Sequence, residues 1–150
     1  MSYTTGYSGD EVLFGNMGCH ALQDLLQFVE STNPNDHLAR IHVTRSTVTR
    51  VFYVTLGLFH EEPHLTRHNF AQQFARAWRT SLFSSFATNF VVTQHVCDDG
   101  DNDLLIFQNE RPILIPGCEA PGLCKQSTFV RIFQRFLNAN CDQLYCSRDR

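Results

Sequence analysis

The residues best suited to chemistry stand in a short polar run, Thr44-Arg45-Ser46-Thr47, between an apolar stretch and a helical one. The run predicts a turn that begins a helix, with Arg45 at the helix N-terminus. Backbone N–H groups there attract anions, and a guanidinium adds paired donors that match phosphate. We therefore expect a phosphate-binding site at Arg45. The simpler interpretation is that most arginines of this segment are solvated or structural: Arg40, Arg45, Arg50, Arg67, Arg76 and Arg79.

Two other patterns resemble metal sites but lack an essential part. His60-Glu-Glu-Pro-His64 matches the zinc peptidase pattern, which needs both histidines one helical turn apart. Pro63 would break that helix, so the match predicts a loop and no zinc. The acidic run from Asp98 to Asp103 lacks the glycine placement and distal glutamate of a calcium loop, which favours a solvated hairpin turn. The sequence therefore predicts no metal and no cofactor.

Six cysteines are many for a cytosolic chain of 150 residues and favour an oxidising compartment. Cys118 and Cys124 flank a Pro/Gly turn, and we expect a local disulfide between them. The other pairings stay open: Cys141 and Cys146 can pair with each other, or one of them with Cys19. The first residues show neither the basic flank nor the apolar region of a signal peptide, so the compartment stays open.

Apolar periodicity predicts the elements that position these residues. Helices are expected over 21–29, 47–56 and 127–137, with Gly57 ending the second one. A fourth helix is expected to begin at Thr66, with Phe70, Phe74 and Trp78 along one stripe. Strands are expected over 38–43, which is short and buried, and over 86–97, 104–108 and 113–115, which turns at 98–103 and 109–112 join into an antiparallel meander. The pattern predicts an α/β fold in one unit.

The overall composition narrows the classes of partner. The net charge of −3 gives no electrostatic reason to expect nucleic acid. No run of 18 apolar residues occurs, so we expect no transmembrane segment. The length and hydrophobic content fit one packed globular domain.

Several short motifs follow one another in a fixed order. The first is Gly18-Cys-His-Ala-Leu-Gln-Asp-Leu-Leu26, and the others are Leu56-Gly-Leu-Phe59, Pro63-His-Leu-Thr-Arg-His-Asn-Phe70, Trp78-Arg-Thr-Ser81, Phe86-Ala-Thr-Asn89, His95-Val-Cys97, Gln108-Asn-Glu-Arg-Pro112 and Ile115-Pro-Gly-Cys118. From about Tyr3 to Tyr145, their order resembles the C-terminal third of a multiple inositol polyphosphate phosphatase. That family is a clade-two histidine phosphatase, related to the histidine acid phosphatases and phytases.

The resemblance implies a fold and a division of the chain. The family has a central sheet flanked by helices, with a helical subdomain inserted into it. Residues 1–150 would form a single partial domain, the C-terminal portion of a histidine-phosphatase-like α/β domain. Residues 1–35 would end the helical insertion, and residues 36–150 would form the C-terminal part of the α/β domain.

The resemblance also implies a mechanism that this sequence does not match. The family phosphorylates the histidine of an Arg-His-Gly-x-Arg motif, and a late His-x-Glu or His-Asp turn protonates the leaving oxygen. No Arg-His-Gly occurs here, and the late turn maps onto Arg45-Ser46-Thr47. Arg45 would replace the histidine, and Thr47 would replace the acid. We expect an N-terminally truncated, inactive relative that binds inositol phosphates or other phosphate anions through Arg45.

Two alternatives stay open. One is a non-enzymatic extracellular interaction protein that forms a homodimer, or binds a protein partner, through an open sheet edge. In relatives, the cysteine corresponding to Cys97 tends to bridge to the N-terminal part, so here it would be a free thiol or join a partner chain. The other alternative is a piece of a longer product with the nucleophile encoded upstream.

Overall fold

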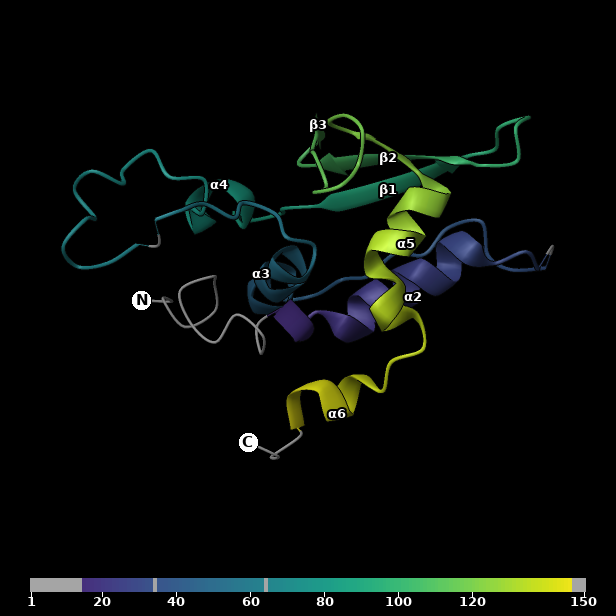
Figure 1. The fold of residues 1–150 in the computed structure, drawn as a ribbon, viewed down its shortest axis with the longest axis horizontal. Helices are drawn as coiled ribbons and strands as arrows, with labels where there is room; N and C mark the ends of the chain where they lie inside the picture. Colours follow the sequence, from purple (N-terminus) through teal and green to yellow (C-terminus); the bar gives the residue numbers. More distant parts are fainter. Residues whose placement is uncertain (1–14, 34, 64, 147–150) are drawn as a thin grey trace.

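An antiparallel sheet forms one layer of the molecule, and helices pack against one of its faces (Figure 1). The computed structural model describes residues 15–33, 35–63 and 65–146. This arrangement confirms the α/β class predicted from the sequence. The three longer helices are α2 (Cys19–Glu30), α3 (Ser46–Thr55) and α5 (Gln126–Leu137), and the short ones are α4 (Thr80–Phe83) and α6 (Cys141–Cys146).

The sheet is organised around β2 (Asp103–Gln108). On one side β2 pairs antiparallel with the whole of β1 (Phe90–His95). On the other side it pairs with β3 (Arg111–Pro112) and β4 (Leu123–Lys125). The hairpin between β1 and β2 confirms the first part of the predicted meander, and β4 was not expected from the sequence.

The third predicted strand, 113–115, is wrong, because pairing begins earlier. Asn109 and Glu110 both have positive φ, 49° and 59°, as a two-residue hairpin turn of type I′ requires. This turn places Arg111 directly opposite Gln108, so β3 starts at once. Beyond β3, the remaining edge of β2 is occupied by β4.

The core lies between the helices and one face of the sheet. α5 contributes Phe129, Phe133 and Phe136, whose spacing places them on one face of the helix. The facing side of β2 supplies Leu104 and Ile106, both buried. The sequence predicted these three longer helices because their apolar periodicity is strong, and the structure confirms each of them. The other buried helical side chains include Leu22, Leu26 and Val29 of α2 and Val51, Tyr53 and Val54 of α3.

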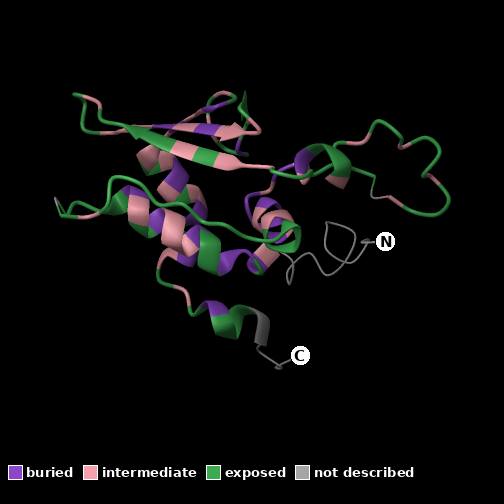
Figure 2. Cartoon of the chain, turned by 180° about the vertical axis from the view of Figure 1, so that it is seen from behind, coloured by how far each residue is buried: buried purple, intermediate pink, exposed green. Residues whose placement is uncertain are grey.

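The predicted buried strand over 38–43 is wrong. These residues form no strand, and the side chains of Leu38, Ile41 and Val43 are 101%, 89% and 97% exposed. Figure 2 shows the stretch as a green line that runs into α3. A strand needs a neighbour with which to share backbone hydrogen bonds. Within the described residues no strand pairs with this segment, so its β-forming composition has no sheet to join.

The predicted helix beginning at Thr66 is also wrong. Thr66 forms only a local turn, in which its hydroxyl accepts from the His68 N–H at 3.3 Å. Phe70 and Phe74 are 64% and 77% exposed, whereas Trp78 packs on Phe83 with ring centroids 4.6 Å apart. Most helical stability in proteins comes from packing an apolar face, and two of the three aromatic side chains find no core surface.

The predicted strand over 86–97 is shorter than expected, because β1 covers only Phe90–His95. Ala87 has a φ of +59°, which an extended strand cannot contain, so the strand begins after it. Phe86 then lies outside the sheet and is fully exposed. The turn predicted at 98–103 joins β1 to β2, with its last residue already in the strand.

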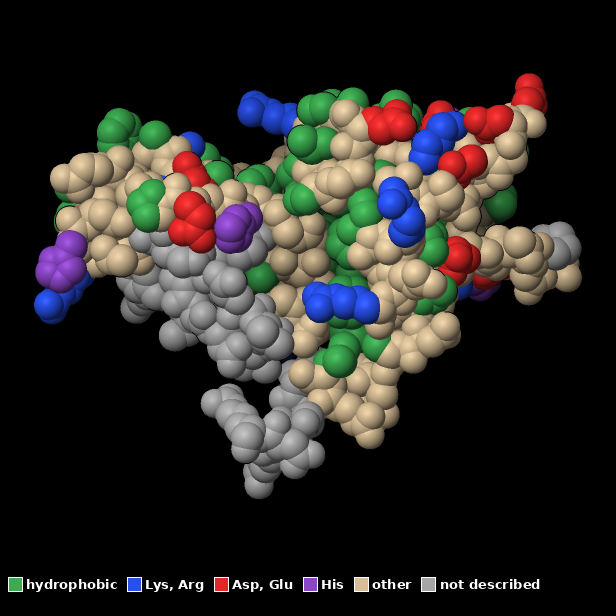
Figure 3. Space-filling view, viewed as in Figure 1, with side chains coloured by type: hydrophobic (Ala, Val, Ile, Leu, Met, Phe, Trp, Pro, Cys, Tyr) green, Lys and Arg blue, Asp and Glu red, His purple; other side chains and the backbone are tan. Residues whose placement is uncertain are grey.

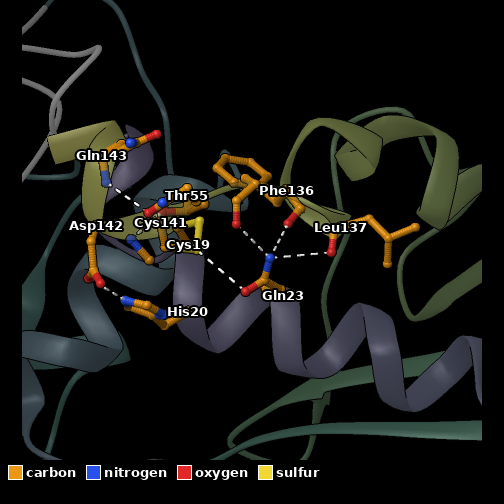
Figure 4. The surroundings of a disulfide bond; sticks show 12 residues. Cys19, His20, Gln23, Thr55, Phe136, Leu137, Cys141, Asp142 and Gln143 are labelled. Atoms are coloured by element: carbon orange, nitrogen blue, oxygen red, sulfur yellow. Dashed lines mark hydrogen bonds and ion pairs between the residues drawn. A yellow bond between two sulfur atoms is a disulfide. The ribbon is translucent and has the colours of Figure 1, made fainter. Parts of the chain in front are cut away.

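Within the part of the chain that the structure describes, two disulfides link distant and local segments. Cys118 and Cys124 form the local bridge expected between them. The pairing that the sequence left open is Cys19–Cys141, which joins the start of α2 to the start of α6 across 122 positions (Figure 4). Cys97 is a free thiol of intermediate exposure.

Candidate functional site

The predicted anion site depends on α3, which is fixed at its C-terminal end. The Gly18 N–H donates to the Thr55 hydroxyl at 2.9 Å, and that hydroxyl donates to the Val51 carbonyl at 2.9 Å. A Cβ at Gly18 would collide with the Thr55 hydroxyl oxygen, so this close approach requires glycine. Gly57, with a φ of +73°, follows the end of the helix as predicted. This packing leaves the other end of α3 facing solvent.

The N-terminal end of α3 is open and carries no acid. Arg45 is its N-cap residue, in extended conformation, and no side chain caps the helix. The first N–H groups of a helix have no acceptor within it, so those of Ser46 and Thr47 remain available. Residues 45–48 are all exposed, and Figure 2 shows this first turn in green. The arrangement leaves the positive end of the helix dipole uncompensated.

Two guanidinium groups flank this open end. Arg50 folds back along the helix, where its Nε donates to the Ser46 carbonyl at 3.2 Å and its Nη2 to the Thr47 hydroxyl at 3.3 Å. The Arg45 side chain has no hydrogen bond or ion pair within the described part of the chain. Its donors are therefore available to an anion, while Arg50 adds a second positive charge within one turn.

The segment that leads into α3 is held by the carboxylate of Asp24. Asp24 of α2 accepts from Arg40 Nη1 at 2.8 Å through one oxygen, and its other oxygen lies 3.0 Å from His42 Nε2. The Arg40 guanidinium also lies over the Phe28 ring, 4.9 Å from its centroid. Arg40 and His42 are thus engaged with α2, which leaves Arg45 as the arginine presented at the helix start.

The site can hold an anion but offers no proton donor of suitable strength. A guanidinium group donates hydrogen bonds but does not give up a proton in general acid catalysis, so Arg45 and Arg50 can hold an anion only. The Thr47 hydroxyl accepts a hydrogen bond from Arg50 and is a far weaker acid than a carboxyl group. Sequence reasoning grouped Arg50 with the other arginines. Its spacing of three and four residues from Thr47 and Ser46 is the signal that could have assigned it.

The acidic turn between β1 and β2 has a structural role instead. Lys125 Nζ lies 3.3 Å from Asp99 and 3.0 Å from Asp103. Asp101 accepts from the Ser127 hydroxyl at 2.6 Å and from the Ser127 N–H at 3.0 Å. Figure 3 shows the acidic side chains gathered at this end of the sheet. The turn therefore joins the sheet to the start of α5.

These contacts shift the acid–base equilibria of the turn. The Ser127 hydroxyl, followed by the Ser127 N–H, lowers the pKa of Asp101. The Asp101 N–H and then the Lys125 ammonium lower the pKa of Asp99. The pKa of Lys125 is raised, chiefly by its hydrogen bond to Asp103. Each group is held in its charged form by a specific partner.

The other metal-like pattern of the sequence begins at His60. His60 lies outside any helix with its Nε2 3.8 Å from a Glu62 oxygen, and His64 lies outside the described residues. Across 15–33, 35–63 and 65–146, no three His, Cys, Asp or Glu residues come together in a way that could hold a metal ion. In the same ranges, no helix is long and apolar enough to cross a membrane.

Comparison with known proteins places the chain beside inositol phosphatases. It is 29% identical to Multiple inositol polyphosphate phosphatase 1 of Drosophila melanogaster over 146 residues, which are 96% of this chain and 30% of the fly protein. The protein of the same name in Dictyostelium discoideum is 29% identical over 99 residues, 64% of this chain and 15% of that protein. The chain thus spans less than a third of either relative. No family model and no solved structure matches it. The partial resemblance predicted from the sequence is confirmed.

Proposed function

We propose that this chain binds phosphate anions, inositol phosphates among them, at the N-terminus of α3 and does not hydrolyse phosphate esters. The observation that carries the proposal is the Arg45 side chain, exposed and without a partner in the described chain, at an uncapped helix start. The partial similarity to inositol polyphosphate phosphatases supports this class of ligand.

The chemistry of binding follows from three kinds of donor. Arg45 offers paired N–H groups that fit two oxygens of one phosphate. The free N–H groups of Ser46 and Thr47 and the helix dipole favour negative charge at the same place. Arg50 adds a positive charge one turn away. A ligand with several phosphates gains more from this arrangement than inorganic phosphate does.

The absence of hydrolysis is proposed from the residues in the turn. In the family that the chain resembles, a proton-donating histidine and an acid are expected at the positions that correspond to Arg45 and Thr47. Neither present side chain releases a proton to a leaving oxygen near neutral pH. Removing a general acid alone typically slows such a reaction by about 10²–10⁴-fold.

Binding can be tested by calorimetric titration with inositol hexakisphosphate and with inorganic phosphate. We expect Arg45→Ala to weaken hexakisphosphate binding about threefold to tenfold, since an exposed charge-assisted contact contributes roughly 1 kcal/mol. Arg131→Ala is the matched control, because Arg131 is an exposed arginine on α5, away from the site. At a ligand concentration a hundredfold above the dissociation constant, folding should be stabilised by about 2.7 kcal/mol. Equal loss in the two variants, or no binding to the unmodified chain, would refute the anion site.

The hydrolysis part needs a separate assay on the same preparation. We expect no phosphate release from inositol hexakisphosphate or nitrophenyl phosphate between acidic and neutral pH. Turnover that survives repurification and is lost in Arg45→Ala would contradict the proposal. Binding without turnover is the combined result expected.

A further inference from the structure

β1 lies at an open edge of the described sheet. Its register with β2 determines which of its backbone groups point outward. The Asn109 N–H bonds to the Asn89 carbonyl at 3.1 Å, and these residues extend the register of β1 and β2 by one pair. In an antiparallel ladder, hydrogen-bonded and non-bonded pairs alternate. The backbone groups of Val91, Thr93 and His95 therefore face β2, and those of Phe90, Val92 and Gln94 face outward.

No described residue satisfies these outward groups. β1 pairs with β2 alone, and no backbone bond to Phe90, Val92 or Gln94 from outside the sheet occurs in the described chain. The opposite edge of the sheet ends in the very short strands β3 and β4. β1 is therefore the one long edge of the described sheet, with alternating donors and acceptors that only another extended strand can match.

The edge also lacks the features that normally prevent strand pairing. Proteins protect open edges with lysine, proline, bulges or inward charges. β1 reads Phe-Val-Val-Thr-Gln-His, with no lysine, arginine, aspartate, glutamate or proline, and it pairs with β2 without a bulge. Its solvent-facing Val91 is 42% exposed, and Val96 just beyond the strand is 89% exposed. Composition and geometry thus agree in leaving this edge ready to pair.

We propose that β1 pairs antiparallel with β1 of a second copy of this chain, with Val92 on the two-fold axis. This register opposes Val92 to Val92 and Phe90 to Gln94 of the second copy, so every outward N–H and C=O meets a partner. On the solvent face it opposes Val91 to Thr93 of the second copy. No like charges oppose each other anywhere along the pair, which makes a second copy an acceptable occupant.

The same geometry limits the affinity. A single pair of six-residue strands buries much less area than the standard interface of roughly 1,600 Å², so the dimer is weak and depends on concentration. The two-fold axis stands perpendicular to the sheet, since strands in one sheet reverse direction without exchanging faces. Both helix layers then lie on the same side of a continuous sheet.

The first test is the molar mass in sedimentation velocity, from micromolar to millimolar protein with free thiols alkylated so that Cys97 cannot crosslink. We expect the mass to rise towards a dimer. Hydrogen exchange at the same concentrations reports the register. The amides of Phe90, Val92 and Gln94 should become protected as concentration rises, whereas those of Val91 and Thr93 are protected throughout by β2. A monomer at every concentration, or protection that does not alternate, overturns the proposal.

A pair of charged variants tests the register with a matched control. Val91→Lys/Thr93→Lys opposes lysines across the axis, whereas Val91→Lys/Thr93→Glu opposes a lysine to a glutamate at the same two positions. We expect the first to associate at least about tenfold more weakly than the second. Thermal unfolding checks that both variants fold. Equal association of the two folded variants overturns this register.

Discussion

At the scale of single residues, Gln23 makes the most consequential polar contact outside the candidate site. Its Nε2 donates to the carbonyls of Phe136, Leu137 and Ala139 at 2.9, 3.2 and 3.0 Å (Figure 4). The last carbonyls of a helix have no partner within it, so one amide from α2 satisfies the C-terminal end of α5. The side chain thus joins two helices that are distant in sequence.

We expect Gln23→Glu to lower the free energy of unfolding by about 2–3 kcal/mol. The substitution removes the amide donor shared by the three carbonyls, of which that of Phe136 also accepts a backbone N–H, from Ala139. It also sets a carboxylate against three carbonyl oxygens, which is costly for partly buried groups. Urea denaturation at neutral pH measures the change. Gln27→Glu is the matched control, because it makes the same substitution at an exposed position of α2. Equal effects of the two variants would show that the contact contributes little.

Residue types predicted the helix that carries the candidate site better than the contacts among the residues around it. The helix that begins after Arg45 follows from local signals and lies where the sequence predicted it, with Arg45 as its extended N-cap residue. The spacing of Arg50 from Thr47 allows the fold-back between them, but the spacing does not fix the Arg50 rotamer that makes it. The bridge between Asp24 and the pair of Arg40 and His42 depends on how α2 meets the following segment, which is a tertiary property.

At the scale of elements, the start of α5 is held by hydrogen bonds to a side chain from outside the helix. Asp101, in the turn after β1, accepts from both the N–H and the hydroxyl of Ser127 at the first turn of α5. A carboxylate at this place satisfies a free N–H and favours the helix dipole. The contact links the hairpin of β1 and β2 to the helix that covers it.

This contact predicts a specific pH dependence of stability. The pKa of Asp101 is lower in the folded chain than its ordinary value of about 3.9, so folding is stabilised when the group is ionised. The contribution is complete above the ordinary pKa and is lost as pH falls through the lowered pKa. We expect Asp101→Asn to be less stable than the unmodified chain at pH 7 and to approach it in strong acid. Thermal unfolding from pH 7 down to about pH 2 measures this.

Ser127→Ala provides the complementary variant, because it removes the hydroxyl that contributes most to the lowered pKa. Its stability should fall less steeply in acid than that of the unmodified chain. A difference between Asp101→Asn and the unmodified chain that stays constant with pH would contradict this interpretation.

The elements divide into those that sequence could predict and those that it could not. The helices α2, α3 and α5 carry apolar stripes that find a shared core, so local periodicity and tertiary packing agree. The stretch 38–43 has the composition of a strand, but composition does not reveal whether a neighbouring strand exists. The stripe of Phe70, Phe74 and Trp78 has the spacing of a helix, but Phe70 and Phe74 find no core surface to cover. β4 is too short for any periodicity to appear.

At the scale of the whole molecule, the two disulfides differ greatly in the length of chain that they close. The Cys19–Cys141 bridge spans 122 positions, and the Cys118–Cys124 bridge spans six. In the chain-entropy model, the first restricts the unfolded chain by about 5 kcal/mol and the second by about 2 kcal/mol. We expect Cys19→Ala/Cys141→Ala to be the more destabilised double variant in guanidinium denaturation. The reverse order would show that the long bridge is not what holds α2 to α6.

The long bridge has a topological consequence. Because a disulfide joins Cys19 to Cys141, the polypeptide between them is closed into a covalent ring. A protease cutting the ring once, for instance in the mostly exposed stretch 60–79, opens it without separating the two pieces. After a single cut the two pieces therefore stay linked through the disulfide. The same exposed stretch is a position at which new chain ends could be introduced by circular permutation.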